Sequence, residues 1–282
     1  MPDVHGKIPS AHFSKFDLII APGDFCGDDI RDLIFKCLFH NKEHSDDTKN
    51  WYDMVSKSQA KKMVNRSLSQ GRVVLEKLDS YGVPVFIVPG NWDWCFDELR
   101  VSDWDFLNKD FYSEFLFKGL KNIVDVYHKK VSFLGFDFIG HGNTSAPEFP
   151  QNPEIVKSLD KAELKFYKKY YSFHKNKLTK LFKSAKNPVI FLSHVVPYNT
   201  SLDTFYHKVQ EKFVHNGSVV ARDLILEFDP IICVGAHIHE HFGSDRLKNT
   251  LCFNAGFGVE KNILVNVSNE KVLSVRYKNL KK

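Results

Sequence analysis

Hydrophobic and polar positions follow one another along the chain in a way that predicts short buried strands separated by amphipathic helices. Several continuous apolar runs are bounded by turn residues, which fits strands covered on both faces. The run at 16–24 stops at a Pro-Gly turn followed by Asp24, and the run at 85–88 stops at a similar turn followed by Asn91. Further strands or β-rich segments are expected at 131–134, 136–139, 189–192, 230–234, 251–253, 263–265 and 272–275.

Apolar residues at helical spacing predict the helices between these strands. One helix is expected at 28–40, and a longer one at 58–80 is expected to break near Gly71. The Asn-Pro-Glu sequence at 152–154 is typical of a helix start, and neither Gly nor Pro follows before residue 188. This last segment therefore forms one long helix or two.

The alternation of strands and helices predicts an α/β fold. We expect a single domain over 1–282, with helical insertions around 41–80 and 151–186. Ser218 is expected to cap a further helix at 219–227.

Composition narrows the class of protein. With 282 residues, 43% hydrophobic and 26% charged, the chain is typical of a soluble folded protein rather than a disordered one. The net charge of +5 only weakly favours an anionic partner. Five scattered cysteines without a C-x-x-C pair fit free thiols in a reducing compartment. No apolar run reaches the roughly 18 residues of a membrane helix and no signal-peptide pattern precedes the fold, so we expect a cytoplasmic protein without a membrane partner.

Lysines line one face of the helical segment 151–186. Such a face attracts a polyanion, but it is more often a solvated helix surface, which is the interpretation we favour. Nucleic acid is therefore a possible partner that the sequence does not favour. The lysines are Lys157, Lys161, Lys165, Lys168, Lys169, Lys175, Lys177, Lys180, Lys183 and Lys186.

Polar side chains stand where several of the predicted strands end. Ligands in α/β sheets gather at the carboxyl ends of strands, which is where Asp24, Asn91 and His194 lie in the sequence. Taken singly, Asp24 and Asn91 are ordinary turn residues, since both types favour turns. An Asn amide oxygen is also a neutral metal ligand, which limits the negative charge that would repel a phosphate.

Two pairs have the spacing that places both side chains on one side of an extended backbone. Asp3 and His5 form an Asp-x-His pair, and His237 and His239 form a His-x-His pair after the strand at 230–234. Carboxylates and imidazoles so placed suit one metal ion. His141 lies between two glycines at another strand end, where it either faces the site or lies in a surface loop.

The ordered set of Asp-x-His, Gly-Asp, Gly-Asn-x-Asp, a strand-end His and His-x-His resembles the calcineurin-like metallophosphoesterase family. The resemblance covers essentially the whole chain, including 193–198 and the closing Asn-Ala-Gly at 254–256. It implies a four-layer α/β/β/α sandwich with a two-metal site. Carried over by position, one metal ion would be held by Asp3, His5, Asp24 and His239, and the other by Asp24, Asn91, His194 and His237.

In such a site the two cations share one carboxylate and one hydroxide, which attacks phosphorus in line. The resemblance thus implies a phosphoesterase acting on a small phosphomonoester or phosphodiester, with Asp24, Asn91 and His141 as catalytic residues. The mixed nitrogen and oxygen ligands suit Mn²⁺, Fe or Zn²⁺, and the sequence does not choose among them.

Three positions depart from the family pattern. Trp92 stands where much of the family has His, so the leaving-group proton has to come from water or from His141, and Asp93 is left to a structural role. Ala236 replaces the usual Gly before the first His of the His-x-His pair, which is a mild change. The strand expected before Asp3 is absent, so we expect the authentic start of translation to lie upstream.

Two other functions remain as alternatives. One is a catalytically silent binding scaffold of the same fold, which Trp92 and the short N-terminal segment favour slightly. The other is a nuclease that uses the lysine-rich helix to guide a strand. Retention of every proposed ligand favours the phosphoesterase.

Overall fold

Two β-sheets stacked face to face form the centre of the molecule. The computed structural model describes residues 3–44, 46–96, 99, 110–145, 147–207, 211–268 and 271–280. The first sheet is parallel and has the order β1-β2-β3, with β1 at Ile19–Ala21, β2 at Val85–Ile87 and β3 at Ile123–Asp125.

The second sheet has six strands in the order β10-β11-β9-β6-β5-β4. Its inner strands pair in parallel, and each edge strand is added by an antiparallel hairpin. The strands are β4 (Lys130–Phe133), β5 (Phe136–His141), β6 (Val189–Val195), β9 (Ile232–Ala236), β10 (Gly243–Leu247) and β11 (Thr250–Asn254).

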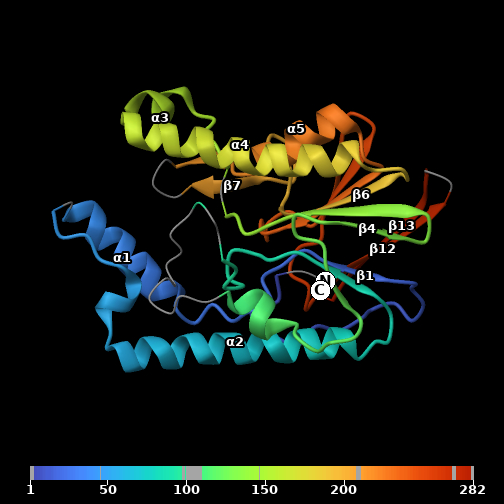
Figure 1. The fold of residues 1–282 in the computed structure, drawn as a ribbon, viewed down its shortest axis with the longest axis horizontal. Helices are drawn as coiled ribbons and strands as arrows, with labels where there is room; N and C mark the ends of the chain where they lie inside the picture. Colours follow the sequence, from blue (N-terminus) through green and yellow to red (C-terminus); the bar gives the residue numbers. More distant parts are fainter. Residues whose placement is uncertain are drawn as a thin grey trace.

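Helices cover the outer faces of the two sheets. Figure 1 shows α2 along the three-stranded sheet and α4 and α5 along the opposite side of the molecule, beside the six-stranded sheet. The order of layers is therefore helix, sheet, sheet, helix. The helical elements are α1 (Arg31–Glu43), η1 (Trp51–Met54), α2 (Lys57–Asp79), η3 (Tyr112–Leu116), α3 (Pro153–Ser158), α4 (Lys161–Lys183) and α5 (Val219–Phe228).

The period of two in a strand explains how one short sheet supplies two hydrophobic cores. In β1 and β2, Ile19 and Val85 belong to the core that contains the apolar face of α2. Their neighbours Ile20 and Phe86 belong to the core between the sheets, where the Phe86 and Phe138 rings stack with centroids 4.2 Å apart. Strands buried on both faces read as continuous apolar runs, as the sequence shows.

One helix differs from expectation, and the segment after Asn152 takes one of the two forms that the sequence left open. Helix α2 runs without a break through Gly71. The glycine allows close packing there, since a Cβ at this position would lie 2.6 Å from the Sγ atom of Cys26. The segment after Asn152 forms two helices, α3 and α4, and Asp160 caps the second by accepting hydrogen bonds from the N–H groups of Ala162 and Glu163. Ser218 caps α5, as predicted.

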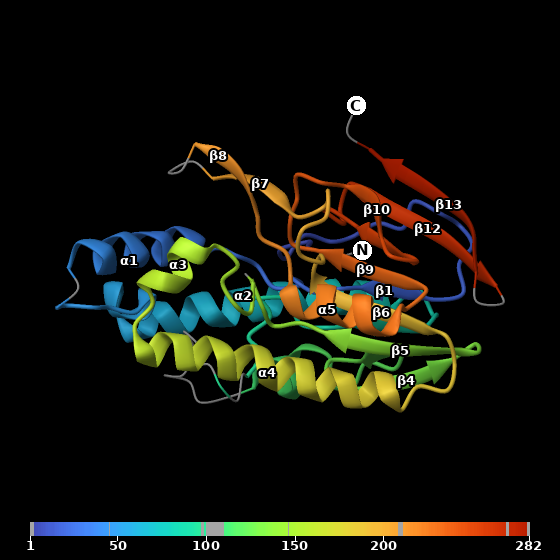
Figure 2. The same cartoon turned by 90° about the horizontal axis from the view of Figure 1, so that it is seen from above.

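Four strands were not predicted: β3, β10 and the hairpin of β7 (Thr204–His207) and β8 (Lys212–His215). Figure 2 shows the β7–β8 hairpin projecting away from the two sheets.

The lysines of α4 that the sequence places on one face are mostly exposed. Among the helices of the described residues, none combines the length and the apolar character that a membrane span requires.

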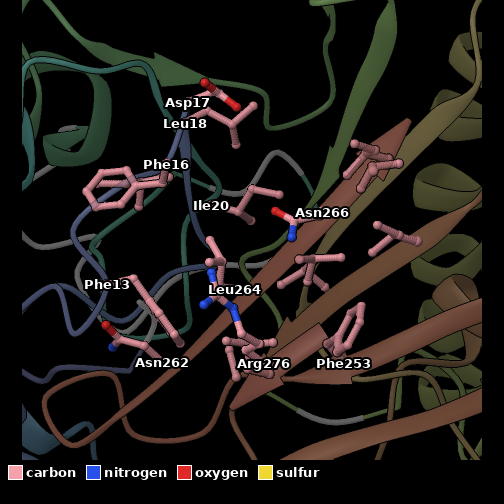
Figure 3. Close-up of a pocket in the computed structure, with 18 of the residues that line it drawn as sticks. Phe13, Phe16, Asp17, Leu18, Ile20, Phe253, Asn262, Leu264, Asn266 and Arg276 are labelled. Carbon is pink, nitrogen blue, oxygen red and sulfur yellow. The ribbon is translucent and has the colours of Figure 1, made fainter. Parts of the chain in front are cut away.

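A second hairpin, β12 (Lys261–Ser268) and β13 (Lys271–Asn279), lies beside the six-stranded sheet. Together with the segment before β1 it encloses a cavity of about 470 Å³. Figure 3 shows this lining, in which Leu264 and Phe253 face Ile20 across the cavity and Arg276 contributes a guanidinium. The cavity also reaches Ile190 and Ile232, where β6 and β9 begin, whereas the expected metal ligands follow the other ends of these strands.

Candidate metal centre

Two Pro-Gly turns at the carboxyl ends of β1 and β2 bring Asp24 and Asn91 to the same edge of the molecule. Gly23 has a φ of +99°, and a Cβ added to it would lie 2.4 Å from the Gly90 nitrogen. A Cβ on Gly90 would lie 2.0 Å from Oδ1 of Asp24. Glycine is therefore required on both turns because the two backbones touch.

Asp93 fastens these turns together. Its fully buried carboxylate accepts hydrogen bonds from the N–H groups of Asp24 (2.8 Å), Phe25 (2.7 Å), Cys26 (3.0 Å) and Gly90 (2.8 Å). Burial raises the pKa of Asp93, and the hydrogen bonds from these N–H groups oppose that rise because they favour the charged carboxylate. This network gives Asp93 the structural role that the sequence suggests for it.

The segment before β1 is held against the first turn by its backbone. The N–H groups of Asp3 and Gly6 donate to the carbonyl oxygens of Gly23 (2.9 Å) and Phe25 (2.9 Å). Those of Val4 and His5 donate to the Asp24 carbonyl oxygen, at 3.1 and 3.0 Å. These bonds place Asp3 and His5 beside the turn without a strand between them. The upstream start expected from the sequence stays a prediction.

The predicted ligands meet in two neighbouring groups. Asp3, His5 and His239 each offer a ligand atom to one group, and the atoms lie within 4.8 Å of one another. Asp24, His194 and His237 form the second group to the same limit. Residues from the amino-terminal segment, two turns and the ends of β6 and β9 thus converge.

Asp24 lies between the two groups. Its Oδ2 atom is 3.5 Å from Nε2 of His194 in one group and 3.9 Å from Nε2 of His5 in the other. Its Oδ1 atom accepts a hydrogen bond of 2.9 Å from the Trp92 N–H group, which fixes the orientation of the carboxylate. One oxygen atom of Asp24 therefore lies near a histidine of each group.

Asn91 also faces the second group. Nδ1 of His194 is 2.7 Å from the Pro22 carbonyl oxygen, so this nitrogen donates a hydrogen bond to it. Nε2 of His194 in turn lies 3.1 Å from Oδ1 of Asn91. An amide oxygen and a ring nitrogen held this close together would both be available to one metal ion.

Buried polar atoms without partners mark the first group. Among the described residues, Oδ1 of Asp3 and both ring nitrogens of His5 are buried and have no hydrogen-bond partner. An unpartnered buried polar atom is costly, and native structures rarely keep one without a ligand or an ion to satisfy it. The residues therefore fit a divalent metal ion.

The protonation states also suit metal binding. Burial lowers the pKa of His5 to about 4 and that of His237 to about 3, so both rings are neutral near pH 7. Burial and the nearby carboxylates of Asp3 and Asp93 raise the pKa of Asp24 well above its usual range. A neutral imidazole is the ligand form, and a bound cation would favour the charged form of Asp24.

The backbone is strained at the same residues. Asp3, His5, Asp24 and His237 have φ angles of 49°, 45°, 57° and 71°, a region that non-glycine residues seldom adopt. The strain at His237 is held in part by its N–H group, which donates to the Asp3 carboxylate. Strain of this kind persists where surrounding contacts fix it, and it concentrates at functional sites.

A family model for calcineurin-like phosphoesterases matches residues 3–241, the stretch that holds every one of these ligands. The chain belongs to the calcineurin-like phosphoesterase family. It is accordingly a metal-dependent hydrolase of phosphoester bonds, with the mixed α/β fold expected from the sequence.

Solved structures resemble this chain at low sequence identity, and the first of them shares its fold. One matches with a TM-score of 0.60 and 13% identity, covering 94% of this chain and 88% of that chain. The protein TT1561 of Thermus thermophilus matches with a TM-score of 0.49 and 15% identity, covering 94% and 87%. The phosphopantetheinyl hydrolase PptH from Mycobacterium tuberculosis matches with a TM-score of 0.47 and 11% identity, covering 92% and 88%. None of the curated protein sequences matches this chain.

Residues that sequence reasoning did not select stand around Trp92 in this phosphoesterase. The Trp92 ring meets the His5 ring edge-on with centroids 6.4 Å apart, and the Arg31 guanidinium lies 5.4 Å from the Trp92 ring centroid. Arg31 also pairs with Asp28 at 2.6 Å, and Asp28 approaches Nδ1 of His5 to 3.9 Å. The sequence indicated only a helix start at residues 28–29, so the contact between Asp28 and the predicted ligand His5 was not predicted.

His141 lies in a different place from the one expected for a catalytic group. Its side chain is fully buried, and its Nε2 atom is 2.8 Å from Oε1 of Glu148. It groups with His128 and His174 rather than with the ligands around Asp24. With no exposure and one nitrogen bound to Glu148, His141 is poorly placed to protonate a leaving group.

Proposed function

We propose that this chain is a phosphoesterase with a dinuclear metal centre, in which Asp24 bridges two divalent ions. The observation that carries the proposal is the position of Oδ2 of Asp24 between His5 and His194. In the proposed site the first ion is held by Asp3, His5, Asp24 and His239. The second is held by Asp24, Asn91, His194 and His237.

The donor set determines which ions suit the site. Imidazole nitrogens together with carboxylate and amide oxygens favour Mn²⁺, Fe or Zn²⁺. When bound, two such ions supply a nucleophilic hydroxide near neutral pH and stabilise negative charge on the phosphoryl oxygens. The chain itself sets the spacing, because Asp93 and the touching Gly23 and Gly90 turns fix Asp24 relative to Asn91.

The side chains around the ligands limit the chemistry further. Asn91 contributes an oxygen without negative charge, so the site repels a phosphoester less than a third carboxylate would. Trp92 cannot transfer a proton, and we propose that water protonates the leaving group. The enzyme should then prefer substrates with good leaving groups. Arg31, which lies over Trp92, is a nearby cation that would attract a phosphoester.

Hydrolysis of small phosphoesters tests the proposal. Purified protein supplied with Mn²⁺ is expected to hydrolyse bis-p-nitrophenyl phosphate or p-nitrophenyl phosphate. Asp24→Asn and Asn91→Ala should abolish this activity, and Asp46→Asn, at an exposed site, should leave it unchanged. Absence of activity with Mn²⁺, Fe²⁺ and Zn²⁺, together with absence of bound metal, would contradict the proposal and favour a silent scaffold.

A further inference from the structure

A second set of histidines, away from the site around Asp24, lies where β5, α4 and the segment after β3 meet. His141 ends β5, His174 lies in α4, and His128 follows β3. Each offers one ring nitrogen, and these nitrogens lie within 4.8 Å of one another, the same limit that the two expected metal groups meet. These three histidines belong to none of the ligand motifs of the family named above, and the proposed reaction does not use them.

Two of the three rings have a nitrogen with nothing to bind. Among the described residues, Nδ1 of His141 and Nε2 of His174 are buried polar atoms without a hydrogen-bond partner, and both side chains are fully buried. Leaving such an atom unsatisfied costs about 1–3 kcal/mol. The same signature identifies Asp3 and His5 in the site around Asp24.

Glu148 sets the tautomer of His141. Its buried carboxylate accepts from Nε2 of His141 (2.8 Å), and also from the Ser218 hydroxyl (2.6 Å) and the Val219 N–H group (2.9 Å). Burial raises the pKa of Glu148, but the hydrogen bonds from His141 and Ser218 outweigh it and leave this pKa below its usual range. Nε2 of His141 is therefore the nitrogen that faces Glu148, and Nδ1 is the ring nitrogen without a partner. A carboxylate behind a histidine is the usual second partner of a metal ligand.

A hydrogen bond joins the other two rings. Nδ1 of His174 and Nε2 of His128 are 3.1 Å apart, so the unpartnered Nε2 is the other nitrogen of the His174 ring. A metal ion that took either of the hydrogen-bonded nitrogens as a ligand would replace this bond. The backbone holds His128 in place, because its N–H group donates to the Gly140 carbonyl oxygen at 2.9 Å while its φ is 51°.

The rings have the charge state that a metal ion needs. Burial and neighbouring histidines lower the pKa of His128 to about 2 and that of His174 to about 3. Lys177 adds to this effect on both rings, and its ammonium group lies 4.2 Å from the Phe173 ring centroid. Neutral imidazole is the ligating form, so no proton has to leave before an ion binds near pH 7.

We propose that His128, His141 and His174 form an additional, mononuclear site for a transition-metal ion of the zinc class. The site joins the six-stranded sheet, α4 and the segment after β3. His128 is only partly buried, so a water molecule would reach a fourth position from its side. Three imidazoles and a water are an established zinc environment. The proposal does not depend on the chemistry proposed for Asp24.

Counting bound zinc tests the site. Chelator-stripped protein is dialysed against Zn²⁺ and the metal per chain is measured by elemental analysis. His128→Gln and His174→Gln are each expected to bind one equivalent less than the wild type. Tyr170→Phe is the matched control, because it keeps the ring that packs against His174, with centroids 4.6 Å apart, and removes no ligand.

The result is read as a difference between variants. The partly buried His40 and the exposed His44, at the carboxyl end of α1, are present in every variant, so zinc bound there cancels. Equal zinc in all four folded proteins would overturn the proposal. In Asp24→Asn the difference caused by His128→Gln should persist, which separates this site from the proposed dinuclear one.

A measurement on the unaltered protein covers the case in which a variant does not fold. Crystals soaked in Zn²⁺ and measured at the zinc absorption edge should show an anomalous peak between the three rings. No peak there, with zinc present elsewhere in the same crystal, would overturn the proposal.

Discussion

Asp93→Asn should weaken the fold more than any exposed Asp→Asn change, because Asp93 joins the two turns of the proposed metal centre. Oδ1 accepts from the N–H groups of Phe25 and Cys26, and Oδ2 accepts from those of Asp24 and Gly90. Asparagine keeps one acceptor oxygen and places an NH₂ group against the other two donors. Two buried N–H groups then lose their partner.

The size of the effect follows from these bonds. A buried donor left unsatisfied costs about 1–3 kcal/mol, so losing two of them costs about 2–6 kcal/mol. Domains are stable by only about 5–15 kcal/mol, so the change is a large fraction of the total. Oδ2 of Asp93 spans both turns, so the substitution should also loosen Asp24 relative to Asn91 and weaken metal binding.

Urea unfolding followed by circular dichroism measures this loss. The protein is kept in chelator, so that bound metal does not stabilise the folded state, and the free energy of unfolding is extrapolated to water. Asp46→Asn is the control, since Asp46 is exposed. A loss below about 1 kcal/mol for Asp93→Asn would refute the role assigned to these hydrogen bonds.

Other substitutions give three further predictions. Trp92→His places an imidazole beside the proposed centre, where it can act as a general acid. The kcat for substrates with poor leaving groups should then rise by about 100-fold. An unchanged kcat would show that the proton comes from elsewhere. Gly90→Ala forces a Cβ to within 2.0 Å of Oδ1 of Asp24, so bound metal and activity should both be lost, and an active variant would contradict the packing argument. In metal-free protein, burial holds the pKa of His128 near 2 and that of His174 near 3, so below about pH 6.5 the unfolded chain binds more protons than the folded one. The free energy of unfolding should therefore decrease as the pH is lowered, by up to about 1.4 kcal/mol per pH unit for each ring. Urea titrations at several pH values should show a smaller decrease in His128→Gln, and an identical slope would contradict the neutral state of that ring.

The residues that follow the strands were the part of the site that the sequence predicted best. Pro-Gly followed by Asp24 and Pro-Gly followed by Asn91 read directly as turns after buried strands, and the structure places both at one edge. A structural role for Asp93 was also predicted, although the four N–H groups that it binds belong to two separate turns and only coordinates reveal them.

Features that depend on contacts distant in sequence were not predictable. Gly71 looked like a helix break, because its contact is with Cys26, far back in the chain. His141 looked like a residue facing the catalytic site, because nothing in its neighbourhood along the chain indicated that His174 and Glu148 would surround it. The β7–β8 hairpin has no clear alternation of apolar and polar residues, so its strands carried no signal.

The most direct test of the account is a crystal structure of the protein loaded with Mn²⁺ and measured for anomalous scattering. The account predicts two peaks about 3.5–4 Å apart, one on each side of Oδ2 of Asp24, with Asn91 and His194 beside one and His5 beside the other. A single peak that contacts only one of the two groups, or none near Asp24 at saturating Mn²⁺, would contradict it.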